Sequence, residues 1–226
     1  MKMIRDVKKD LSLRIHSLGG IKFREEGYTF NLHKKYPDAP KSPNYVDLRG
    51  IVRNRLMRMQ IAGLMAGFIL KIKPDRLIDL PEAITPLVTT LSDLTGIEMI
   101  SVRSEALKGT TKDHGEKNII NGHFERGMTG LLIDDVVSSM AATKFNAFPI
   151  LRNAGLNLLP CVCVIMDREE GGAERLSREG YELKSLLGLH TDVTKYCFGE
   201  GIISEEILRM SVDFARVAKE YSLQAE

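Results

Sequence analysis

The segment from Leu131 to Thr143, LLIDDVVSSMAAT, constrains the fold of this chain more than any other. Its short apolar run with polar flanks is typical of a buried strand, and we expect that strand to end at Asp134 and Asp135. A loop and the start of a helix should follow, an arrangement that offers backbone N–H groups to a phosphate. The two carboxylates could hold ribose hydroxyls and a hard cation. Acidic pairs at strand ends also serve as plain turn and helix-cap residues, so the pair alone leaves both interpretations open.

Alternating strand-like and helical segments surround this one and favour an α/β fold with a mostly parallel sheet covered by helices. The expected strands are 77–80, 98–102 and 158–166, and the expected helices are 51–71, 83–95, 143–153, 174–179 and 202–221. Ligands bind such sheets beyond the carboxyl ends of the strands. The residues expected at that rim are Asp79-Leu80-Pro81, Arg103, Asp134-Asp135 and Asp167-Arg168.

Residues 1–50 do not follow this alternation. They read as a helix over 3–17, a strand-like stretch over 28–32, a Pro-rich loop over 33–43 and a strand over 44–49. A chain of 226 residues suits one sizeable domain. We therefore expect a single domain over 1–226, with an N-terminal hood over 1–50 and an α/β core over 51–226.

Composition points to a soluble cytoplasmic protein. The net charge of +2 gives no argument for nucleic acid, and no basic stripe or helix-turn-helix pattern is seen. The N-terminus is charged, and the apolar stretch 61–70 is too short to span a membrane. Three cysteines without zinc-like spacing are expected to be buried, reduced thiols: Cys161, Cys163 and Cys197.

The Asp-pair segment resembles the signature of the type I phosphoribosyltransferases, and four further segments narrow the resemblance to the orotate phosphoribosyltransferases. They are Gly19 to Phe30 together with SPNYVDLR (42–49), Arg103-Ser104-Glu105, KDHGE (112–116) and DREEGG (167–172). These segments occur in the family's order from about Gly19 to Gly172. The resemblance implies the type I phosphoribosyltransferase fold.

The resemblance also implies an activity, namely transfer of the phosphoribosyl group from phosphoribosyl pyrophosphate to orotate in pyrimidine biosynthesis, with Mg²⁺. Lys112 and His114 would close over the departing pyrophosphate and, with Asp134 and Asp135, form the catalytic set. The guanidinium of Arg168 would grip the orotate carboxylate, with Ser138 also on the orotate side.

The residues that the resemblance assigns to phosphoribosyl pyrophosphate are Arg103, Lys108, Asp134, Asp135, Val136, Val137, Ser138, Ser139, Met140, Ala141 and Ala142. The metal would be held indirectly, through the substrate, near Asp134 and Asp135. The family also implies a homodimer.

The sequence departs from the family in both phosphate loops. Met140 stands where a Gly is expected and Ala141 where a Thr is common; a Gly there permits close approach of a phosphate. The loop after 77–80 reads Pro81-Glu82-Ala83-Ile84-Thr85-Pro86 and lacks both family glycines, and Asn31 and Ser104 replace basic residues. Two interpretations follow: an orotate phosphoribosyltransferase, or a catalytically impaired relative that acts as a nucleotide-binding or regulatory subunit.

Overall fold

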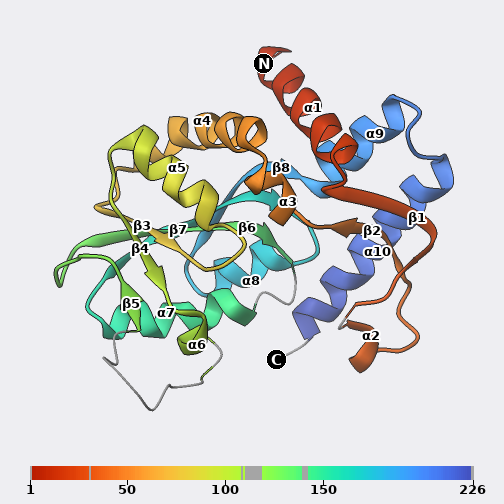
Figure 1. Cartoon of the computed structure of the whole chain (residues 1–226). Helices are drawn as coiled ribbons and strands as arrows, with labels where there is room; N and C mark the ends of the chain where they lie inside the picture. The colour runs from red at the N-terminus through yellow and green to blue at the C-terminus, as the bar shows by residue number, and fades with distance from the viewer. Residues whose placement is uncertain (1, 31, 108, 110–118, 139–141, 225–226) are drawn as a thin grey trace.

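A six-stranded sheet with the order β5-β4-β3-β6-β7-β8 runs through the described part of the protein (Figure 1). The computed structural model describes residues 2–30, 32–107, 109, 119–138 and 142–224. The parallel strands are β3 (Arg76–Asp79), β4 (Met99–Val102), β6 (Thr129–Val137), β7 (Asn157–Asp167) and β8 (Glu182–Gly188). The short β5 (Ile120–Asn121) pairs antiparallel with β4 at one edge. The expected mostly parallel sheet is confirmed.

Helices cover both faces of this sheet because alternate strand residues point to opposite sides. Leu131 and Ile133 of β6 belong to a core with α1 (Lys2–Ser17), α4 (Arg55–Ile72) and α5 (Thr85–Thr95). Leu132 belongs to a second core with α7 (Ala142–Asn153) and α8 (Gly172–Arg178). β6 therefore lies between two apolar layers, as the continuous run LLI predicts.

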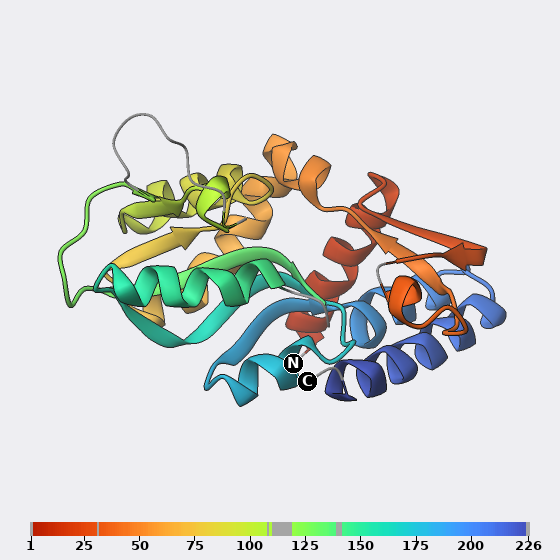
Figure 2. The same cartoon turned by 90° about the horizontal axis from the view of Figure 1, so that it is seen from below.

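The N-terminal segment forms an antiparallel pair, β1 (Ile21–Tyr28) and β2 (Ser42–Val46), against which the final helix α10 (Glu205–Gln224) packs. Ser211 Oγ lies 2.6 Å from Asn44 Nδ2 in a fully buried hydrogen bond. The rings of Tyr36 and Tyr221 stack with their centroids 4.2 Å apart. Figures 1 and 2 both show α10, in dark blue, alongside this hood. The C-terminal helix thus holds the hood in place.

The hood differs from the expectation at one turn. The predicted strand over 28–32 is wrong, since β1 ends at Tyr28 and a one-turn helix α2 (Leu32–Lys35) begins at the last residue of that predicted strand and continues into the predicted loop. Leu32 explains the change, because its buried side chain packs in a small core with Ala39 and Phe214 of α10. A tertiary contact with a distant helix overrides the local alternation.

Other differences are local. The single helix expected over 51–71 is divided into α3 (Arg49–Arg53) and α4 by Asn54, whose side chain caps α4 by accepting a 3.2 Å hydrogen bond from the Met57 N–H. Segments without an expected element form α6 (Ser104–Leu107), β8, a π-helix η1 (Leu189–Thr194) and α9 (Lys195–Gly199). β8 is an edge strand that is buried only at its end, so its sequence carries little periodicity.

Candidate active site at the carboxyl edge of the sheet

The carboxyl ends of β3, β4, β6 and β7 bring the expected rim residues to one edge. Asp79 is in register with Ser101 on one side and Ile133 on the other, and Val137 with Asp167. The expectation that the β6 strand ends at the aspartates is wrong: it runs to Val137, because the ladder with β7 continues beyond them. The N–H of Arg168 donates to the Val137 carbonyl (3.0 Å), which joins the DREEGG segment to the end of β6.

The paired aspartates are fixed by local hydrogen bonds. The Asp135 N–H donates to Asp134 Oδ1 (2.8 Å), and the Val136 N–H donates to Asp135 Oδ1 (2.7 Å). Arg49 binds Asp47 through two hydrogen bonds of 2.8 and 2.6 Å, which raise the pKa of its guanidinium, and the charge of Asp135 adds to this effect. The NYVDLR segment and the Asp pair are therefore electrostatic neighbours.

Asp79 is a completely buried carboxyl group at the end of β3. Its Oδ2 accepts hydrogen bonds from the hydroxyls of Thr85 (2.7 Å) and Ser101 (2.9 Å), while Oδ1 has no partner among the described residues. Burial raises its pKa, and the two hydroxyls partly oppose that shift. Through Thr85 this carboxyl holds the N-terminus of α5 and the loop before it.

A cavity of about 410 Å³ opens beside this loop. Its lining residues are Pro81, Glu82, Ser101, Val102, Arg103, Ser104, Glu105 and Asn121. Arg103 donates through Nε to Asn121 Oδ1 (3.0 Å). One guanidinium thus shares this cavity with two carboxylates, and Ser104 and Glu82, both departures from the family pattern, line it directly.

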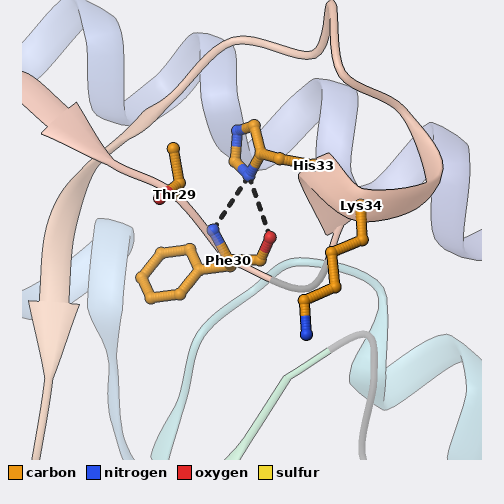
Figure 3. A pocket seen from close by; sticks show the side chains of 4 residues that line it. All are labelled: Thr29, Phe30, His33 and Lys34. Atoms are coloured by element: carbon orange, nitrogen blue, oxygen red, sulfur yellow. Dashed lines mark hydrogen bonds between the residues drawn. The ribbon is translucent and has the colours of Figure 1, made fainter.

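A second cavity of about 430 Å³ lies in the hood and is lined by Thr29, Phe30, His33 and Lys34 (Figure 3). The guanidinium carbon of Arg168 lies over the Phe30 ring, 4.8 Å from its centroid. The structure therefore places the predicted orotate-binding arginine beside an aromatic ring that the sequence interpretation did not single out. Ring and guanidinium together form a platform suited to a flat anionic base.

Arg168 is held by Glu170. Nε donates to Glu170 Oε1 (3.0 Å), and Nη2 lies 2.8 Å from the same oxygen as an ion pair without the alignment of a hydrogen bond. Among the described residues the hydrogens on buried Nη2 therefore have no acceptor. Glu170 is only 3% exposed; burial raises its pKa, and the charge of Arg168 opposes that rise.

Two glycines allow the DREEGG segment to pack this closely. Gly171 has φ +97°, and a Cβ there would lie 2.9 Å from the Ser222 side chain of α10. A Cβ on Gly172 would lie 2.2 Å from Val137 Cγ1 and 3.0 Å from the carbonyl oxygen of Ser138. The two glycines therefore let the loop that carries Arg168 pack against Ser138. Both of these residues are predicted to lie on the orotate side of the site.

Sequence reasoning missed the network behind this loop. Glu169 Oε2 accepts hydrogen bonds from the N–H groups of His190 (2.6 Å) and Thr191 (2.9 Å) at the start of η1. Burial lowers the pKa of His190 to about 4 and raises that of Asp167 to about 6. π-Helical turns are frequent at functional sites, but no local pattern in LHTDVT indicates one.

Several predicted site residues lie outside the described part of the chain. They are Lys108, Lys112, His114, Ser139, Met140 and Ala141. Ala142 is the first residue of α7. Among the residues that the structure does describe, no three His, Cys, Asp or Glu side chains gather to hold a metal directly. No helix in the described ranges combines the length and apolar character needed to cross a membrane.

Comparison with known proteins gives a consistent result. The chain is 30% identical over 196 residues to the orotate phosphoribosyltransferase of Cenarchaeum symbiosum, covering 86% of this chain and 92% of that protein. It is 34% identical over 152 residues to bovine uridine 5'-monophosphate synthase, covering 66% of this chain. It is 32% identical over 148 residues to the orotate phosphoribosyltransferase of Caenorhabditis elegans, covering 65% of this chain. The matches span 30% of the bovine and 62% of the nematode protein. No family model matches the chain.

The structure of Leishmania donovani UMP synthase shares the fold, with a TM-score of 0.74 and 24% identity over 94% of this chain and 42% of that one. Fold and rim together define a type I phosphoribosyltransferase. Within that class, the chain belongs to the orotate phosphoribosyltransferase family, at 30% identity to a relative of which it covers 92%.

Proposed function

We propose that this protein transfers the 5-phosphoribosyl group from phosphoribosyl pyrophosphate to orotate, forming orotidine 5'-monophosphate and pyrophosphate. The observation that carries the proposal is the Arg168 guanidinium over the Phe30 ring, at the same sheet edge as Asp134 and Asp135. A guanidinium with unused N–H donors suits the carboxylate of orotate, and the aromatic ring suits the flat pyrimidine. This is the step that makes the nucleotide in pyrimidine biosynthesis.

In the proposed reaction, the bond from the ribose to pyrophosphate breaks with its electron pair leaving on oxygen. An orotate ring nitrogen forms the new bond to the same carbon, and its proton passes to the departing pyrophosphate or to solvent. The carboxylates of Asp134 and Asp135 would accept hydrogen bonds from the ribose hydroxyls. Backbone N–H groups from Ser138 to the start of α7 would bind the 5-phosphate, as helix N-termini favour anions. Lys112 and His114 would stabilise the leaving group, and these two roles stay predictions.

The leaving group would enter the cavity beside the 81–86 loop. Arg103 lies there beside two acidic residues, Glu82 and Glu105, so the cavity alone offers little net positive charge. We propose that Mg²⁺ binds with the substrate, where it would neutralise pyrophosphate charge. The oxygen chemistry of Asp134 and Asp135 suits such an ion, which would be held near this pair through oxygens of the substrate.

We also propose a cytoplasmic homodimer. The three cysteines are buried free thiols, which suits a reducing compartment.

The proposed dimer interface is the outer face of α4. This helix is apolar around most of its circumference, and it leaves Leu56, Met59 and Leu70 exposed at 67%, 42% and 49%. A second copy could cover this face. Light scattering coupled to size exclusion would test it: a mass of one chain at micromolar concentration would contradict the homodimer.

The test of the activity is orotate consumption with phosphoribosyl pyrophosphate and Mg²⁺. We expect turnover that Asp134→Asn and Lys112→Ala both abolish, with Asp38→Asn, an exposed hood residue, as the matched control. A wild-type protein that neither turns over orotate nor binds phosphoribosyl pyrophosphate in calorimetry would contradict the proposal. The alternative function, that of a nucleotide-binding or regulatory subunit, would then be favoured over the transferase.

A further inference from the structure

The loop expected to read the base carries more negative than positive charge. Arg168 is followed by Glu169 and Glu170 and preceded by Asp167. The Arg168–Glu170 contact is an ion pair that leaves no net charge, and Asp167, with a pKa of about 6, is mostly ionised at neutral pH. The nearby His190 has a pKa of about 4 and is neutral there. An anionic base approaching Arg168 would therefore meet a loop of net negative charge.

Other described cations near this loop are engaged. Lys219 of α10 forms an ion pair with Glu174 of α8, and Lys8 of α1 forms one with Asp192 of η1 (2.8 Å). Arg49 is held by Asp47. None of these can turn toward a substrate without breaking an existing pair.

Lys34 differs from them. It lines the cavity that includes Phe30, it is exposed, and it makes no hydrogen bond or ion pair within the part of the chain that the structure describes. Figure 3 shows the Phe30 ring to the left of the Phe30 backbone and the Lys34 side chain to the right, both lower in the view than the His33 imidazole. Arg168 lies over the Phe30 ring and Lys34 shares a cavity lining with Phe30, so Phe30 is the common neighbour of the two cations.

The turn that carries Lys34 is itself held in place. His33 Nδ1 lies 2.9 Å from the Phe30 nitrogen and Nε2 lies 3.2 Å from the Pro40 carbonyl oxygen. A tautomer with its hydrogen on Nε2 satisfies both contacts, accepting from the Phe30 N–H and donating to Pro40. Leu32 anchors the same turn in the core beneath α10. The ammonium of Lys34 therefore projects from a fixed one-turn helix.

We propose that Lys34 is a specificity-determining residue, which binds the carboxylate of the base and supplies the net positive charge that the Arg168–Glu170 pair does not. This inference rests on the proposed function, since it takes orotate as the base. Arg168 then orients the base through Nη2 and the Phe30 platform, and Lys34 provides the charge that selects an anionic base over a neutral one. A flexible ammonium on a fixed turn suits this role.

Calorimetric titration of the full chain with orotate tests this directly. The variants are Lys34→Gln, the charge-conserving Lys34→Arg, and Lys41→Gln as the matched control, because Lys41 is an exposed lysine of the same hood outside the cavity lining. Removing a charge-assisted contact should weaken orotate binding about tenfold in Lys34→Gln. Lys34→Arg should stay within about threefold of wild type and Lys41→Gln should be unchanged. Uracil, which lacks the carboxylate, should bind all four proteins equally, and so should ribose 5-phosphate.

Three results would overturn the inference: orotate affinity unchanged in Lys34→Gln, loss of ribose 5-phosphate affinity in place of orotate affinity, or no orotate binding to the wild-type protein. Turnover, measured separately, distinguishes this failure from failure of the proposed function. If Lys34→Gln turns over orotate with an unaltered KM, the role of Lys34 is contradicted and the proposed transferase function is not. If orotate binding depends on Lys34 but the wild-type protein shows no turnover, the transferase function is contradicted and the role of Lys34 in binding the base is supported.

Discussion

The guanidinium carbon of Arg168 lies 4.8 Å from the centroid of the Phe30 ring, and this contact joins two segments that are far apart in the sequence. Phe30 belongs to the hood and Arg168 to the loop after β7. Because neither segment forms this contact alone, the proposed base site requires the hood to be docked on the core. The packing of α10 against β1 and β2 stabilises that docking.

Replacement of Phe30 by Leu should raise the KM for orotate about tenfold and leave the KM for phosphoribosyl pyrophosphate nearly unchanged. The reason is that a cation–π contact contributes roughly 0.5–2 kcal/mol and leucine has no ring to face either the guanidinium or the base. Phe30→Tyr, which keeps the ring, is the control. Steady-state kinetics with each substrate varied in turn would measure it, and equal rises in both KM values would contradict the role.

Replacement of His33 by Ala should lower the free energy of unfolding by about 1 kcal/mol, because the Phe30 N–H and the Pro40 carbonyl lose their side-chain partner. Asn at this position offers a short acceptor and should recover part of the loss. Urea denaturation gives the free energies, and orotate titration shows whether Phe30 has shifted. An Ala variant with wild-type stability and affinity would show that His33 does not hold the turn.

Much of this architecture follows from the sequence. The apolar runs around Leu131 and Cys163 indicate buried parallel strands. Because parallel strands end at one edge of a sheet, the sequence alone predicts that Asp79, Asp134 and Arg168 lie together at that edge. The resemblance of the Asp-pair segment and four further segments to the orotate phosphoribosyltransferases then indicated the family. These inferences needed only local periodicity and chain order.

What the sequence could not give depends on contacts between distant segments. The turn at Leu32 forms because Phe214 and Ala218 of the distant helix α10 supply its core. Phe30 belongs to the proposed base site only because Arg168 reaches it. The ion pair between Arg168 and Glu170 could not be predicted, because the sequence DREEGG is also typical of a solvated charged turn. β6 passes the Asp pair because β7 continues to pair with it, a fact set by the partner strand.

Replacement of Glu82 by Gln should strengthen pyrophosphate binding a few-fold at low salt. Glu82 lines the proposed leaving-group cavity with Arg103 and Glu105, and removing one carboxylate lessens repulsion of an anion. The gain should shrink as ionic strength rises, because salt screens this interaction. Titrations of pyrophosphate with Mg²⁺ at two salt concentrations would show it, with the exposed Glu125→Gln as control. Weaker binding in Glu82→Gln would mean that Glu82 instead helps to hold the metal.

The stability of the protein should fall in acid in a way that depends on His190. Burial lowers the pKa of this imidazole to about 4, below the ordinary value of 6.5, so the folded state disfavours its protonated form. The stability this provides is fully present above pH 6.5 and is lost as the pH falls toward 4, by roughly 2–3 kcal/mol. Asp167 acts in the opposite sense, because its pKa of about 6 makes the folded protein bind a proton more readily than the unfolded chain.

The contribution of His190 is therefore isolated by comparison with a variant. His190→Gln removes the titration, so the difference in unfolding free energy between wild type and variant should shift by those 2–3 kcal/mol between pH 7 and pH 4, in favour of the variant at low pH. His123→Gln, at an exposed position, should show no such shift. Urea titrations at half-unit pH steps would measure both. A constant difference across the range would mean that His190 is not a neutral, buried group in the folded protein.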